Sequence, residues 1–203
     1  MIFHPVVVIL LLLTFVVQEF IPGIEIAQFA TLFLPPVFFF TASVAVPFPI
    51  MLMLAFGTGF LWDARHLQAL SHAVGDAAEL LGDGGGSEFT TGLGMPFGIS
   101  IVFFAFLGTM LQGIRPLFKR GRLEFPVVMV GLATFSWMLM QYIVISFLRG
   151  SLDFDPMLWT KMITGTLLSM LAAPLLFLLL YSLARLSSYE IKYEGLRYRF
   201  DGR

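Results

Sequence analysis

Long apolar segments without a charged residue dominate this sequence and limit what it can fold into. Five of them occur, at residues 1–18, 26–62, 89–114, 125–148 and 162–184. A helix needs about 20 apolar residues to cross the hydrocarbon core of a bilayer, so each segment predicts a membrane-spanning helix. Backbone groups in lipid must be paired internally, which helices achieve, and these segments lack the alternation of barrel strands. The sequence therefore predicts an all-α integral membrane protein.

The composition agrees with this class and excludes others. Charged residues make up 12% of the chain and hydrophobic residues 58%, whereas a soluble domain carries about 25% charged residues. The net charge of −1 provides no basic field for nucleic acid. Because cysteine is absent, disulfides, thiol catalysis and Cys-ligated metals are excluded. The first segment lacks a positive n-region and a small-x-small cleavage site, so it predicts a retained helix and not a signal peptide.

Proline divides the longest segment. Residues 26–62 exceed one crossing, and "VPFP" at 46–49 predicts a break because proline removes a backbone donor. The prolines Pro35 and Pro36 either kink the second helix or start it. The second and third helices are short enough to form a hairpin that only partly enters the bilayer. Six helices in a compact bundle are predicted, at about 2–20, 29–46, 50–64, 97–114, 126–148 and 158–184.

Basic residues predict the orientation. Lys and Arg are enriched in cytoplasmic loops, and placing both termini in the cytoplasm puts nine of the twelve on that side. These are Arg115, Lys119, Arg120, Arg122, Arg185, Lys192, Arg197, Arg199 and Arg203. The sequence "RPLFKRGR" at 115–122 then serves as a lipid anchor at the membrane surface. Residues 1–186 form the predicted membrane domain, and 187–203 a cytoplasmic tail.

Two segments outside the apolar runs have patterns of their own. Within a periplasmic insertion at about 64–91, apolar residues at spacings of three and four predict an amphipathic helix that covers the outer face of the bundle or docks a partner. They are Leu67, Leu70, Val74, Ala77 and Leu81. The tail "YEIKYEGLRYRF" alternates apolar and charged residues around "EG", which predicts a β-hairpin that docks on a partner or at the lipid interface.

Asp63 is the acidic residue that most resembles a catalytic group. It ends "AFGTGFLWD", but three residues separate it from Gly59, whereas intramembrane aspartyl proteases place the aspartate directly after Gly-x-Gly. No second aspartate lies in a predicted span to share a proton with it. We therefore expect one of two roles for Asp63. It marks the helix end where the third helix reaches outer water, with Trp62 in the interface belt, or it takes part in helix packing and interaction. Gly57 and Gly59 predict close helix packing more than ligand contact.

The remaining polar residues have structural explanations. Gln18 and Gln112 lie within predicted spans, where interhelical hydrogen bonds account for them, although a polar pathway is an alternative. His66 and His72 match no zinc spacing with the nearby acids, and Ser100 lacks a nucleophile motif. The sequence thus predicts no catalytic residue, no metal site and no cofactor.

Four stretches resemble the family of the rod shape-determining protein MreD. They are "LFLPPVFFFTASVAVPFP", "AFGTGFLWD" with its Gly-x-x-x-Asp ending, "GLGMPFGISIVFFAFLGTMLQ" and "LWTKMITGTLLSMLAAPLLFLLLYSLARL". The resemblance covers most of residues 1–186. The chain departs from the family at Leu34, where a polar or basic residue is usual, in the insertion at 64–91, and in the tail.

The resemblance implies a non-enzymatic scaffold of the bacterial cell-elongation complex in the inner membrane. Its partners would be an MreC-like bitopic protein, the actin-like MreB filament system and the wall synthases that make peptidoglycan. The implied fold is similar to the substrate-binding subunits of vitamin transporters, so such a transporter subunit is the alternative function. Those subunits carry Ala-x-x-x-Ala spacings, and "PVVVILLLLTFVV" at 5–17 has none.

Overall fold

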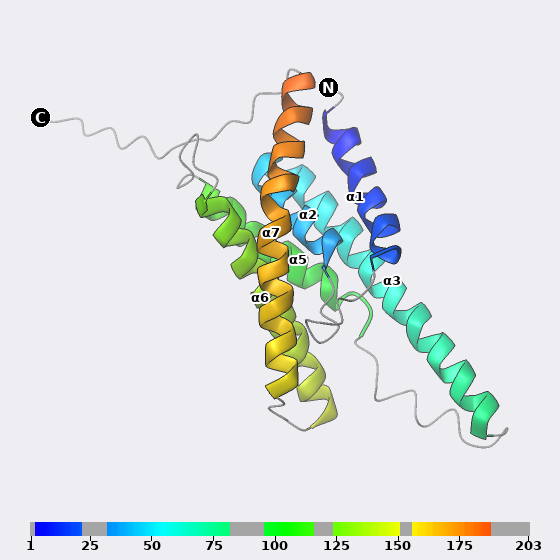
Figure 1. Cartoon of the computed structure of the whole chain (residues 1–203). Helices are drawn as coiled ribbons and strands as arrows, with labels where there is room; N and C mark the ends of the chain where they lie inside the picture. Colours follow the sequence, from blue (N-terminus) through cyan, green and yellow to red (C-terminus); the bar gives the residue numbers. More distant parts are fainter. Residues whose placement is uncertain (1–2, 22–31, 82–95, 116–123, 151–155, 188–203) are drawn as a thin grey trace, which may run out of the picture.

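The computed structural model is an antiparallel bundle of α-helices (Figure 1). It describes residues 3–21, 32–81, 96–115, 124–150 and 156–187, and for residues 68–81 and 149 only the helical backbone. Its six helices are α1 (Phe3–Glu19), α2 (Leu34–Ala45), α3 (Phe48–Leu81), α5 (Ile99–Ile114), α6 (Glu124–Arg149) and α7 (Pro156–Leu186). Within these ranges there is no strand, so the all-α prediction with six helices is confirmed there. The predicted tail hairpin lies outside the described residues.

The shortest helix, α2, forms the centre of the bundle. It contacts each of the other five helices, and every side chain from Pro35 to Ala45 is buried. Twelve residues give a helix of about 18 Å, which is shorter than the ~30 Å hydrocarbon core of a bilayer. The prolines of "LPP" start this helix and do not kink it. Its burial explains its composition, since phenylalanine, valine and small residues fill all of its faces.

The third helix is longer than the sequence predicted. It runs without a break from Phe48 to Leu81, and Figure 1 shows its C-terminal half projecting past the other helices. The prediction of a helix ending near residue 64, followed by a separate amphipathic helix over the bundle, is therefore wrong. Most residues after Asp63 are strong helix formers and none is proline, and the change in polarity does not interrupt the backbone hydrogen bonds. The predicted apolar stripe from Leu70 onward lies among residues whose side chains are outside the description.

The helices α6 and α7 form an antiparallel pair, and both are long and apolar enough to cross a membrane. Their packing is reciprocal. Gly131 of α6 leaves space that the side chain of Met170 of α7 occupies. In the same way, a Cβ built on Gly165 of α7 would lie 3.1 Å from the terminal methyl group of Met138 of α6. A glycine opposite a flexible methionine lets two helices approach closely.

Aromatic rings join the helices at the core. Trp62 of α3 and Trp137 of α6 meet edge to face with their centroids 4.9 Å apart. Phe33, directly before α2, packs edge to face on both tryptophans. Phe104 of α5 stacks on Trp137 at 5.6 Å. Edge-to-face pairs add about 0.5–1.5 kcal/mol beyond the area that they bury. Two members of this cluster, Phe33 and Trp62, also line the pocket described below.

Candidate functional site

Gln18 completes the hydrogen bonding at the start of the buried helix. The N–H groups in the first turn of a helix have no partner within the helix. In α2 the prolines at 35 and 36 have no N–H, and Val37 N–H already donates to the Phe33 carbonyl at 3.2 Å. The remaining donor, Leu34 N–H, donates to Oε1 of Gln18 at 2.7 Å. A side chain of α1 thus caps α2, and the Gln18 side chain is buried for this reason.

Gln112 has the matching role at the other end of α2. Within a continuing helix the Ser43 carbonyl would accept from the N–H of residue 47, but that residue is proline. The Nε2 group of Gln112 donates to the Ser43 carbonyl at 2.6 Å and to the Val46 carbonyl at 2.8 Å. Arg115 also donates to the Val46 carbonyl, at 3.2 Å. Both predicted interaction glutamines therefore form interhelical bonds to the backbone of the central segment.

Asp63 lies inside the bundle and not at a helix end. Only 6% of its surface is exposed, and its Oδ2 accepts a hydrogen bond from Gly98 N–H at 2.7 Å. Gly98 has a φ of +97° and precedes α5, so the carboxylate lies at the positive N-terminal end of that helix. The expectation that the third helix ends at Asp63 is wrong, because α3 continues to Leu81. The buried carboxylate and its bond to Gly98 agree with the alternative role in helix packing. Asp63 joins α3 to α5.

Of the two glycines in the third helix, one is at a close contact. A Cβ built on Gly59 would lie 2.5 Å from the Ile101 Cα of α5, which the backbone cannot accommodate. A Cβ built on Gly57 would meet no atom within 4 Å. The close-packing prediction therefore describes Gly59, and for Gly57 it is wrong. Both have the same local sequence context, and the approach of α5 distinguishes them.

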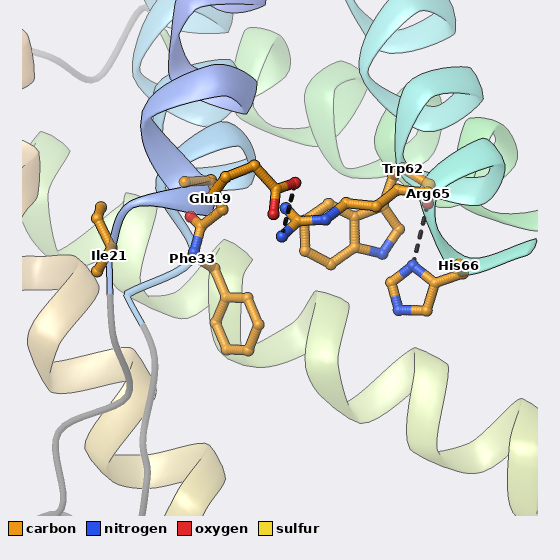
Figure 2. Close-up of a pocket in the computed structure, with 7 residues that line it drawn as sticks. Glu19, Ile21, Phe33, Trp62, Arg65 and His66 are labelled. Atoms are coloured by element: carbon orange, nitrogen blue, oxygen red, sulfur yellow. Dashed lines mark hydrogen bonds and ion pairs between the residues drawn. The ribbon is translucent and has the colours of Figure 1, made fainter. Parts of the chain in front are cut away.

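A pocket of about 330 Å³ opens where α1 ends, α2 begins and α3 passes (Figure 2). Its lining combines aromatic and charged side chains: Gln18, Glu19, Ile21, Phe33, Trp62, Arg65 and His66. Figure 2 shows Ile21 and Phe33 on one side, His66 on the other, and the Glu19 and Arg65 side chains meeting between them. This volume lies within the range of about 300–1,000 Å³ that is typical of small-molecule sites.

An ion pair crosses this pocket between α1 and α3. Nη2 of Arg65 lies 3.0 Å from Oε1 of Glu19, and the two side chains are 35% and 59% exposed. Nδ1 of His66 lies 3.0 Å from the Trp62 carbonyl, which can only accept, so Nδ1 carries the proton. In the neutral ring Nε2 is then an acceptor. The indole nitrogen of Trp62 is buried and has no hydrogen-bond partner in the described part of the chain.

The contact between Glu19 and Arg65 was not predicted from the sequence. They are 46 positions apart, and no periodic pattern links residues at such a separation. The burial of Trp62 likewise replaces its expected place in an interface belt. Ser100 is buried in α5 with its hydroxyl unpaired among the described residues. Of the predicted lipid anchors, Arg115 is described above, whereas Lys119, Arg120 and Arg122 lie outside the described ranges.

Within the described segments, no three or more His, Asp or Glu side chains lie together in a way that could hold a metal ion. The arrangement instead offers backbone capping by Gln18, Gln112 and Asp63, and one mixed polar and aromatic pocket. Comparison with protein-family models, curated proteins and solved structures finds no match to this chain.

Proposed function

We propose that this chain is an integral membrane protein in which all six helices contact lipid or one another within the bilayer. The polarity of α7 supports this proposal. Its buried face includes the small residues Gly165, Ser169, Ala173 and Ala184 alongside Met162, Phe177 and Leu180, while Leu171 and Leu175 are 73% and 69% exposed. In water such a helix would turn the leucines inward, whereas membrane helices use small residues for contact and leucine for lipid.

The other helices share this arrangement. Every helix except α2 exposes several large apolar side chains. In the most apolar windows of α6 and α7, 33% and 28% of residues are buried, whereas the core helix of a soluble protein would be mostly buried. On α1 the buried stripe ends in Thr14 and Gln18, and Ile9, Leu13 and Val16 face outward. Exposed apolar surface of this extent favours lipid as the surrounding medium.

Within the membrane, the function that we propose is a non-enzymatic scaffold of the cell-elongation complex in the bacterial inner membrane. The basis is the resemblance to the MreD family in the segments around Pro35, Gly59 and Asp63. The observation that best supports a structural role for those residues is the set of contacts that they make. Pro35 lies in the first turn of the buried helix α2, Gly59 lets α3 approach α5, and Asp63 bonds α3 to Gly98 directly before α5. Polar groups engaged in this way stabilise a rigid bundle whose outer faces are free to bind neighbours.

The proposed partners are an MreC-like bitopic protein, the MreB filament system and the wall synthases, with both termini of this chain in the cytoplasm. A rigid surface suits this role because few groups lose conformational freedom on binding. The N-terminal end of α1 and the C-terminal end of α7 lie at the same end of the bundle (Figure 1), which is compatible with that topology.

Depletion in the native rod-shaped cell, followed by complementation, tests this role. We expect depleted cells to lose rod shape and become round, and wild-type protein to restore it. Asp63→Asn is also expected to restore it, because the amide oxygen still accepts from Gly98 N–H. Asp63→Leu is expected to fail, because the Gly98 donor is left unpaired. Normal rods after depletion would contradict the proposal, and failure of Asp63→Asn at wild-type protein levels would indicate that the charge itself acts.

A transporter substrate-binding subunit is the second candidate function, and the pocket of about 330 Å³ is the observation that favours it. Carriers enclose most of the surface of their ligand. Here Glu19 at the pocket is 59% exposed, so the pocket is open to the surface of the bundle. Stoichiometric binding of a vitamin-sized solute by the purified protein, with depleted cells remaining rods, would favour the carrier over the scaffold.

A further inference from the structure

The pocket between α1, α2 and α3 carries one cation and one anion that a ligand can reach. The Arg65–Glu19 pair is partly exposed, and pairs of this kind contribute only about 0–1 kcal/mol to stability in water. A ligand that supplies both charges can therefore replace the pair by two new pairs at little cost. A ligand with a single charge would leave either Arg65 or Glu19 without a counterion.

Gln18 adds a hydrogen-bond donor to the lining that carries the cation. It uses its Oε1 to cap Leu34, which leaves the amide nitrogen as a donor at the pocket. Together with the guanidinium of Arg65, this amide matches the acceptor oxygens of a phosphate or carboxylate. The Nε1–H of Trp62 also has no partner in the part of the chain that is described, but this nitrogen has no exposed surface.

Groups that favour a cation are on the same lining. Glu19 supplies a carboxylate to the lining. The rings of Phe33 and Trp62 form the aromatic walls, and aromatic faces attract ammonium groups by about 0.5–2 kcal/mol. The lining therefore contains partners for both signs of charge within one volume of about 330 Å³.

We propose that this pocket binds a zwitterion in which a phosphate or carboxylate lies a few atoms from an ammonium group. The anionic part binds Arg65 and the Gln18 amide, and the ammonium binds Glu19 and the aromatic walls. An aminoalkyl-phosphate lipid headgroup and a free aminoalkyl phosphate share this chemistry. For the lipid, the exposed side chains of Leu13, Val16 and Phe20 provide an apolar path along α1 for an acyl chain. The lipid source rests on the proposed membrane location, but the site does not depend on the role in cell shape.

Native mass spectrometry of the purified full-length protein in a nonionic detergent tests the site. The probes are phosphatidylethanolamine, phosphatidylglycerol and diacylglycerol with identical chains. We expect one phosphatidylethanolamine to be retained at least tenfold more tightly than either of the others, which corresponds to about 1.4 kcal/mol. Equal retention of the three lipids, with no displacement of phosphatidylethanolamine by free phosphoethanolamine, would overturn the proposal. Displacement at stoichiometric free phosphoethanolamine assigns the soluble source, and retention against an excess assigns the lipid headgroup.

Charge variants make the test specific. Arg65→Gln is expected to weaken phosphatidylethanolamine binding at least tenfold, whereas Lys161→Gln, which removes an exposed cation from α7, is expected to leave it unchanged. Glu19→Gln is expected to shift the preference toward phosphatidylglycerol, because Arg65 is then free to bind an anion, and Glu124→Gln serves as its control. Equal binding by Arg65→Gln and Lys161→Gln would refute the assigned site. Rod shape restored by Arg65→Gln would separate this site from the scaffold function.

Discussion

Replacing Gly59 with alanine is expected to destabilise the bundle by about 1 kcal/mol net, although alanine is the better helix former. The added Cβ would lie 2.5 Å from the Ile101 Cα and 2.6 Å from the Ile101 nitrogen, so α3 and α5 must move apart along their contact. Overpacking of this kind costs about 1–3 kcal/mol, which outweighs the ~1 kcal/mol that alanine gains over glycine in a helix. Thermal or denaturant unfolding in detergent measures the effect.

Gly57→Ala is the matched control, two residues away on the same helix. Its Cβ meets nothing within 4 Å, so only the gain in helix propensity remains, and we expect stabilisation by about 0.5–1 kcal/mol. The two substitutions are chemically identical and should have opposite signs. If Gly59→Ala stabilises the protein as much as Gly57→Ala does, the close approach of α3 and α5 is incorrect.

Gln112→Leu is expected to lower the free energy of unfolding by about 3 kcal/mol. Leucine has a similar size but donates no hydrogen bond, so the Ser43 carbonyl loses its donor and the Val46 carbonyl keeps only Arg115. A buried group left unpaired costs about 1–3 kcal/mol. The loss acts on the end of the central helix, so amide exchange in α2 should accelerate together with the fall in stability.

Thr109→Val on the same helix controls for the change from polar to apolar. The Thr109 hydroxyl is exposed and bonds the Ala105 carbonyl of its own helix, so its removal leaves no buried group unpaired. We expect less than about 0.5 kcal/mol for this substitution. If the two variants have the same free energy of unfolding and the same rate of amide exchange in α2, the cap does not stabilise α2.

The sequence predicted the helices well where a local physical cause exists. Apolar segments and proline determine where α1, α2, α5, α6 and α7 lie, because both act within a few residues. The continuation of α3 was missed because the change to polar residues after Asp63 was interpreted as a helix end. Polarity reports the surroundings of a helix, whereas its continuity depends on backbone bonding and propensity, which remain favourable through Leu81.

The candidate site was less predictable because it depends on contacts between distant segments. Gln18 and Gln112 could be identified as polar residues within spans, but their carbonyl and amide partners follow only from the position of α2. The Glu19–Arg65 pair and the unpaired Trp62 nitrogen arise from the packing of α1 on α3. Gly57 and Gly59 show the same limit, since local sequence treats them alike and only the position of α5 makes them differ.

The central claim, that the bundle is embedded in lipid, is tested most directly by the accessibility of spin labels along α7. The chain has no cysteine, so single cysteines at Met157, Leu171 and Leu186, all exposed, can each be labelled alone in reconstituted bilayers. Leu171 is the middle residue of α7. We predict that the ratio of collisions with oxygen to collisions with a water-soluble nickel chelate is greatest at Leu171 and falls toward both ends. A uniformly low ratio, with the chelate reaching Leu171 as readily as Met157, would contradict the claim.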